Sequence, residues 1–464
     1  MSDFMDAKEM RKETGAENKM GIMPVNKLLV SMSLPMMISM LVQALYNVVD
    51  SIFVSRINEN ALTAVSLAFP LQSLMISLGT GTGVGINALL SKSLGEKDIK
   101  KANKVAMNGI LLAVVNYFIF LIIGLVAVKP FYASQTTDTQ ILEYGYQYLT
   151  VVCCCSFGMY GQFIFERLLQ STGKTVYTMI TQSTGAVINI ILDPILIFGY
   201  FGLPKMGVMG AAVATVIGQI IAAVLAFFIN QKKNTEISLE FKGLQPDKKV
   251  IGQIYAVGIP SIIMQAIGSV MTYGMNRILM VFTSTAAAVF GVYFKLQSFI
   301  FMPIFGLNNG MVPIIAYNYG AGKRDRLIKT MKFSIIYAVS IMLIGVLVFQ
   351  LFPAKLFALF EASETMLAIG IPALRTISLS FLLAGFCIIC GSVFQALGNG
   401  VYSMIVSIAR QLVVLLPAAY LLSRLGNVNY VWWAFPIAEI VSLVMSLFFL
   451  MMINKKIISH IGEA

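Results

Sequence analysis

The stretch "SLPMMISMLVQALYNVVDSIFVS", residues 33–55, carries one charged side chain, Asp50, in an otherwise largely apolar run. About 20 apolar residues are enough for a helix to cross the roughly 30 Å hydrocarbon core of a bilayer. Comparable runs recur along all 464 residues, of which 58% are hydrophobic and only 12% charged, whereas about a quarter of an average soluble domain is charged. The sequence therefore predicts an all-α polytopic membrane protein.

The apolar runs between charged or turn-rich breaks predict twelve transmembrane helices. The polar, mixed-charge start of the chain lacks the apolar core of a signal peptide, so we interpret it as a tail. The predicted helices cover residues 28–54, 62–90, 105–128, 146–170, 176–201, 207–230, 251–282, 286–317, 331–352, 366–396, 402–425 and 430–453.

The distribution of Lys and Arg predicts the orientation of these helices. Basic residues gather in the N-terminal tail, in the C-terminal tail and in the loops at 91–104, 231–249 and 318–332. Cytoplasmic loops carry such an excess, so both termini are predicted to be cytoplasmic. The net charge of +12 is then mostly a matter of topology, and no nucleic-acid partner is needed to explain it. The opposite loops hold only Arg56, Lys129, Lys205, Lys355 and Arg424.

The two halves of the chain resemble each other at a nearly constant offset. "FPLQS" at 69–73 matches "FKLQS" at 294–298, and "QSTGKTVYTM" at 170–179 matches "QALGNGVYSM" at 395–404. Six helices per half make the repeats parallel, and such bundles enclose a central site whose exposure alternates. We therefore expect two six-helix lobes around a central cleft. The predicted units are an N-terminal tail at 1–24, lobes at 25–230 and 250–453, a linker at 231–249 and a C-terminal tail at 454–464.

One acid lies directly before a proline in "NIILDPILIFGY", residues 189–200. Asp193 follows Asn189 by four residues, so both side chains project from one helix face. Pro194 has no N–H, which leaves the carbonyl of Ile190 without its helical partner and predicts a kink. Intramembrane acids are rare and mark ion or substrate pathways. The carboxylate, amide and freed carbonyl are oxygen ligands suited to a hard cation such as sodium, or to proton exchange.

A second acid lies in the first predicted helix. Gln43, Asn47 and Asp50 are spaced by four and three residues, so they form one polar stripe. Asp50 and Asp193 are predicted to lie at similar depth, which favours a shared chamber within the N-terminal lobe that Thr215 also lines. Two carboxylates there would repel, so they would exchange a proton or hold one cation. The alternative is that each acid only hydrogen-bonds to a neighbouring helix.

The predicted second lobe differs, because its intramembrane charges are mostly basic. These residues form structural pairs, extend toward the interface, or lie on a pathway. Candidate substrate-pathway residues are Tyr46, Asn47, Gln72, Lys295 and Gln297. "GLNNG" at 306–310 either bends its helix around a cavity or lets helices pack closely. The intramembrane charges of this half are Arg277, Lys295, Arg375, Arg410 and Glu439.

Several motifs fail as enzyme signatures. "STGKT" at 171–175 ends like a phosphate-binding loop, but Leu168 stands where the first glycine is required. "GTGTGVG" at 79–85 lacks the spacing of a dinucleotide fingerprint and suggests helix packing. His460 is the only histidine and lies in the predicted tail, which removes histidine-based catalysis. We therefore expect no enzyme activity, no cofactor, and no metal beyond a possible sodium ion at Asp50, Asp193 and Asn189.

With these features in hand, the chain resembles the multidrug and toxic compound extrusion (MATE) family, and its MepA-like bacterial subgroup most. The resemblance covers roughly residues 25–453. It is carried by the opening stretch, by "NIILDPILIFGY", by "GVMGAAVAT" at 207–215 and by "MVPIIAYNYGAG" at 311–322. In relatives with a cation site in the N-terminal lobe, the matching positions here are Gln43, Asp50, Asn189, Asp193 and Thr215.

The resemblance implies a secondary active antiporter of the bacterial cell (inner) membrane. It would export small-molecule drugs and other xenobiotics, often amphiphilic organic cations, in exchange for protons or sodium ions, and we expect it to act as a monomer. Other branches of the family carry acids in the seventh and tenth helices, where this chain has Gln265 and no core acid. The alternative function is a flippase for a lipid-linked precursor in the same wider superfamily.

Overall fold

The computed structural model describes residues 17–240, 245–360 and 362–462, and within these ranges the regular elements are all helical. Ten helices are long and apolar enough to cross a membrane, or up to twelve when each of two bent pairs counts as one span. The prediction of twelve spans is thus confirmed. Eight spans are single helices: α3 (Val25–Ser55), α4 (Glu59–Gly95), α5 (Ile99–Val126), α9 (Thr175–Phe198), α10 (Val208–Lys233), α11 (Lys248–Met280), α12 (Ser284–Gly320) and α13 (Arg324–Leu351).

The two bent spans occur at equivalent places in the two halves. α7 (Thr139–Cys154) and α8 (Phe157–Ser171) meet at 44°, and α15 (Glu364–Ser378) and α16 (Phe381–Ala396) meet at 49°. Each pair follows a short helix, α6 (Val128–Ala133) or α14 (Pro353–Ala358). The sequence predicted neither break, because neither the Cys155–Ser156 nor the Leu379–Ser380 junction contains proline or glycine, the usual breakers.

The last two spans are also subdivided. The eleventh consists of α17 (Gly400–Ile408), a π-helical turn η2 (Ala409–Leu415) and α18 (Leu416–Ser423). The twelfth consists of α19 (Val428–Val431) and α20 (Ala434–Lys456). The remaining short elements are α2 (Lys19–Ile22), η1 (Tyr200–Gly202) and η3 (Ile458–His460).

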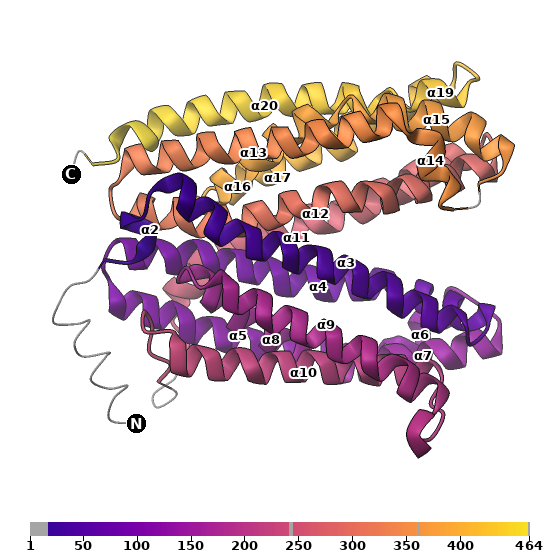
Figure 1. The fold of residues 1–464 in the computed structure, drawn as a ribbon, viewed down its shortest axis with the longest axis horizontal. Helices are drawn as coiled ribbons and strands as arrows, with labels where there is room; N and C mark the ends of the chain where they lie inside the picture. Colours follow the sequence, from indigo (N-terminus) through magenta and orange to yellow (C-terminus); the bar gives the residue numbers. More distant parts are fainter. Residues whose placement is uncertain (1–16, 241–244, 361, 463–464) are drawn as a thin grey trace.

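The helices of the first half, indigo to magenta in Figure 1, lie beside those of the second half, orange to yellow. α2 and the C-terminal end of α20 lie at the same end of the bundle, which we call the terminal end. The halves meet mainly where α3 and α4 pack against α12 and α11. The arrangement is the predicted one of two six-helix sets.

Glycines allow this close approach between the halves. A Cβ at Gly310 of α12 would collide with the backbone of Ser33 in α3, and one at Gly85 of α4 with the carbonyl of Ile254 in α11. Small residues that let helix backbones touch are the usual means of helix association in a membrane. Of the two readings of "GLNNG", the structure supports close packing.

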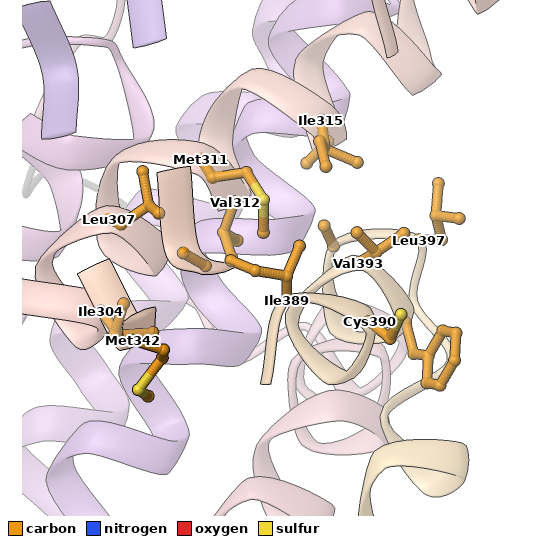
Figure 2. Packing of buried hydrophobic residues seen from close by; sticks show 14 of the residues in the cluster. Ile304, Leu307, Met311, Val312, Ile315, Met342, Ile389, Cys390, Val393 and Leu397 are labelled. Carbon is orange, nitrogen blue, oxygen red and sulfur yellow. The ribbon is translucent and has the colours of Figure 1, made fainter. Parts of the chain in front are cut away.

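The second half has a continuous apolar core that extends into the adjoining helices of the first half. Figure 2 shows Met311 of α12 next to Ile389 of α16, and Ile304 of α12 next to Met342 of α13. All are fully or almost fully buried. Because lipid tails are as apolar as these side chains, the stabilisation comes from close packing rather than from removal of water. Met32 of α3 and Ile86 of α4 belong to the same cluster, so the core also joins the two halves.

Candidate functional site

The predicted acids meet within the first half, near the end of the bundle opposite the termini. Asp50 lies in the last two turns of α3, and Asp193 lies in the last two turns of α9. α9 remains helical through Pro194 as far as Phe198, where Gly199 ends it with φ +76°. The two helices pack along each other, so the acids reach one site.

A close contact between α9 and α10 builds the wall of this site. A Cβ at Gly218 would lie 2.7 Å from the carbonyl oxygen of Gly185, so only glycine permits the approach. The contact brings Asn189 next to Thr215. In the orientation that satisfies both ends of the Asn189 amide, its nitrogen donates to Asp193 Oδ2 at 3.1 Å. Its oxygen accepts from the Thr215 amide at 3.0 Å and from the Thr215 hydroxyl at 3.1 Å.

The two carboxyl groups are direct neighbours. Asp193 is 0% exposed and Asp50 is partly buried, and their side chains lie within hydrogen-bonding range of each other. One oxygen of each group, Asp50 Oδ1 and Asp193 Oδ1, is buried without a hydrogen-bond partner. A buried carboxylate oxygen left unsatisfied is costly. These two oxygens are therefore suited to a shared proton or to one small cation.

Two tyrosines complete the cluster. Tyr46 of α3 lies close to Thr215 and to both acids. Tyr148 of α7 is 4% exposed, lies near Asp50 and Tyr46, and accepts a hydrogen bond at its hydroxyl from Gln72 Nε2 at 3.1 Å. We call this group the acid cluster. Its members are Tyr46, Asp50, Gln72, Tyr148, Asn189, Asp193 and Thr215.

Tyr148 was missed at the sequence level. Tyr144, Tyr146 and Tyr148 alternate along one span, so spacing alone did not choose among them. Tyr46 and Gln72 were predicted on a substrate pathway; both lie in the acid cluster, and their pathway role stays a prediction.

Other predicted residues are not joined to the cluster. The side chains of Gln43 and Asn47 make no hydrogen bond to it within the described ranges. Lys295 is exposed and lies 5.9 Å from the centre of the Phe360 ring. Gln297 has no side-chain hydrogen bond to the described part of the chain. Substrate-pathway roles for Asn47, Lys295 and Gln297 stay predictions.

Two charges of the second half form a structural pair, one of the predicted alternatives. Arg410 Nη1 donates to Glu439 Oε2 at 3.3 Å, which joins the π-helical turn η2 to α20. The Glu439 side chain is 6% exposed. A π-turn often marks a functional position. Here it places Arg410 beside Glu439 within one lobe, and Glu439 Oε1 is buried without a hydrogen-bond partner.

A buried carboxylate on α8 also escaped the sequence analysis. Glu166 is 2% exposed and accepts hydrogen bonds from Gln162 Nε2 at 3.0 Å, Thr181 Oγ1 at 2.9 Å and Gln182 Nε2 at 2.8 Å. Gln182 in turn accepts from Ser39 of α3. The spacing of Gln162 and Glu166 on one helix face was a usable signal. The network ties α8, α9 and α3 together in the half of the bundle nearer the termini.

A segment before the first span holds the two halves together at the terminal end. We call residues 17–24 the strap. Asn18 Nδ2 donates to the carbonyl of Thr172 in the first half. On the second half, Asn318 and Arg326 donate to the carbonyl of Met20, both at 3.0 Å. Met20 is 0% exposed. Hydrogen bonds between the halves continue from this end as far as Thr80 of α4 and Gln265 of α11, and the bundle is closed at the terminal end.

A bundle of two repeated six-helix halves, closed at one end and with a buried acid cluster in one half, defines a polytopic membrane transporter. The MatE family model matches residues 35–195 and 260–421, most of each half. The chain belongs to the MATE family of multidrug efflux transporters, and to its MepA-like subgroup.

Curated relatives and solved structures agree with this assignment. The multidrug export protein MepA of Staphylococcus haemolyticus (strain JCSC1435) is 29% identical over 432 residues, covering 93% of this chain and 94% of the relative. MepA of Staphylococcus aureus (strain NCTC 8325 / PS 47) is 30% identical over 424 residues, covering 90% and 91%. A multidrug resistance MATE transporter in an outward-facing conformation superposes with a TM-score of 0.88 at 26% identity, covering 95% and 97%.

Proposed function

We propose that this transporter is a secondary active antiporter that exports amphiphilic, often cationic compounds in exchange for protons or sodium ions. The carrying observation is the pair of neighbouring carboxyl groups, Asp50 and Asp193, each with a buried oxygen that has no partner. The substrate class is proposed from the relatives named as multidrug export proteins. Their names also disfavour the flippase alternative.

The proposed coupling role of Asp50 and Asp193 is based on the repulsion between their negative charges. Two carboxylates at short range repel, and the repulsion grows where water is scarce. The site is therefore stable when it holds one proton or one cation, and unstable when it holds neither. Asn189 fixes Asp193 through Oδ2, which leaves Oδ1 for the exchangeable ion. A proton would be shared between the two carboxyl groups. A sodium ion would find carboxylate and tyrosine oxygens, the ligands that hard cations prefer.

The link between this site and the interface supports the proposal of alternating access. α3 carries Asp50 near one end, and nearer the other end it carries Ser33, whose hydroxyl donates to the carbonyl of Leu307 in α12. A change of charge at Asp50 therefore acts on a helix that also forms the contact between the halves. In parallel-repeat transporters, rocking of one half against the other changes the exposed side. We propose that the closed terminal end faces the cytoplasm, as the basic loops predict.

The test is transport in vesicles. The purified protein is reconstituted in proteoliposomes, and ethidium movement is followed while proton and sodium gradients are imposed separately. We expect movement only with one of the gradients, and loss of it in Asp50→Asn and Asp193→Asn. The matched control is Glu143→Gln, because Glu143 is an exposed acid of α7 outside the acid cluster. Unchanged transport in both aspartate variants would contradict the coupling assignment.

A further inference from the structure

The failed nucleotide motif "STGKT" at 171–175 lines a cavity of about 380 Å³ at the terminal end. The cavity lies between the strap, the loop before α9 and the segment after α10. Its lining includes Lys19, Thr172, Gly173, Lys174, Tyr177 and Glu236. The space is far larger than the roughly 30 Å³ that one water molecule occupies in the liquid. It could therefore hold a polyatomic ion or a lipid headgroup.

Positive charge converges on this cavity. Burial, and then the neighbouring charge of Lys174, lower the pKa of Lys19. Within the described ranges, no carboxylate forms an ion pair with Lys19. The stem of Lys19 lies over Gly173, where an added Cβ would be 3.1 Å from Lys19 Cε. Lys19 and Lys174 carry like charges that act on each other across the cavity. An anion between them would offset this repulsion, so the two lysines create a demand for negative charge.

The start of α9 adds to this demand. The helix begins at Thr175, and the residue before it, Lys174, gives no side-chain cap. The first turn of a helix carries partial positive charge. The amides of Gly173 and Lys174 donate to the carbonyls of Gln170 and Leu169, so they cannot cradle a phosphate as a nucleotide-binding loop does. Glu236 also lines the cavity, but the lining still has more positive than negative side chains.

The position of the cavity favours a phosphate group. α9 crosses the membrane from Thr175, so the cavity lies where a membrane-spanning helix emerges among lipid headgroups. Val176, which is 46% exposed, and Tyr177 border the charged part. A charged site with an apolar border suits a phosphate joined to a lipid. Basic pockets at this depth on the cytoplasmic side commonly bind acidic headgroups.

We propose that the cavity formed by Lys19, Lys174 and the start of α9 binds an anionic phosphate group, either of an acidic lipid headgroup or of free phosphate. The bound anion draws Lys19 toward the first half, in the same direction as the bond from Asn18 to Thr172. Since the strap also bonds to the second half through Met20, the anion stabilises the closed terminal end. The proposal does not depend on the acid cluster.

Thermal unfolding of the purified full-length protein in a neutral detergent tests the site without any transport. The added probes are short-chain phosphatidylglycerol, inorganic phosphate, short-chain phosphatidylcholine, and sodium chloride at matched ionic strength. We expect phosphatidylglycerol, phosphate or both to raise Tm in a saturable way, while the other two do not. In Lys19→Gln/Lys174→Gln, the concentration for half the shift should rise about tenfold or more, as expected for the loss of charge-assisted hydrogen bonds.

Three variants make the result interpretable. Lys19→Arg retains the charge and should retain the effect, and Lys19→Gln alone serves if the double variant does not fold. Lys232→Gln/Lys233→Gln removes two exposed charges near the end of α10 and should leave the shift unchanged. A response to phosphatidylglycerol alone assigns the site to lipid, and one to phosphate alone assigns it to the free ion. No shift, a shift that survives the double variant, or equal loss in the Lys232/Lys233 control would overturn the proposal.

The effect on the strap has a separate readout. Spin labels at Lys100 and Lys329, exposed positions of the first and second halves near the terminal end, report the distance between the halves in a variant without native cysteines. We expect the anion that raises Tm to increase the short-distance population, and Lys19→Gln to abolish that increase. An unchanged distance distribution would refute the coupling between the cavity and closure.

Discussion

The two halves of this transporter share one scaffold but fill it differently. Shifting each cluster position by the repeat offset of 225 carries Tyr46 and Asp50 to Met271 and Met275, and Tyr148 to Ala373. These three counterparts are buried in the apolar core of the second half. Gln72 alone retains its residue type, as Gln297. Equivalent helix positions therefore hold a buried acid cluster in the first half and apolar packing residues in the second.

The largest expected effect comes from replacing Asp193 of the first half by the residue at the equivalent position of the second half. Asp193→Ala places in α9 the residue found at its counterpart Ala418. It removes one of the two acids and leaves Asp50 without the neighbour that makes proton or cation binding favourable. Ion-driven ethidium transport in proteoliposomes should fall at least tenfold, which corresponds to about 1.4 kcal/mol or more.

The matched control for that experiment is Ala418→Ser in the second half. It changes a small residue at the equivalent position without touching the acid cluster, so transport should remain near the wild-type rate. Equal losses in the two variants would show that the halves do not differ in the proposed way.

The charged pair of the second half should matter for stability rather than coupling. Glu439→Gln leaves Arg410 without its ionic partner. Removing one member of a buried pair costs roughly 3 kcal/mol or more, so the midpoint of unfolding should fall clearly. Arg410→Met/Glu439→Leu removes both charges and should recover most of the loss. A change of the coupling ion in Glu439→Gln, with stability unchanged, would place this pair in the transport mechanism instead.

Adding a single methyl group at the contact between the halves should destabilise the closed state. Gly85→Ala places a methyl group against the carbonyl of Ile254 across the interface. Overpacking of this kind costs about 1–3 kcal/mol, here specifically in the state closed at the terminal end. Gly252→Ala on α11 is the control, because a Cβ there meets nothing within 4 Å. Labels across the terminal end should show opening in the first variant only.

The features that depend on residue spacing along one helix could be predicted from the sequence. Asn189 and Asp193 share a face by their four-residue spacing, and the apolar runs identify all twelve spans. Contacts between helices were harder to predict. The choice of Tyr148 over its neighbouring tyrosines, and the bond from Gln72 to it, depend on how α4 and α7 pack. The bends near Cys155 and Leu379 likewise lack a local signal, because tertiary packing rather than a breaker residue produces them.

The smallest expected effect concerns Thr215, which orients Asp193 indirectly through Asn189. Thr215→Val keeps the shape of the side chain but removes the hydroxyl that the Asn189 amide contacts. One hydrogen bond of this kind is worth about 1 kcal/mol, so the ion concentration for half-maximal transport should change a few-fold while the maximal rate stays nearly constant. Thr184→Val is the control, since that hydroxyl bonds only to the carbonyl of Ile180 on the same helix. If both variants behave alike, the Thr215 hydroxyl is not needed to orient Asn189, and the bond from the Thr215 backbone amide is sufficient.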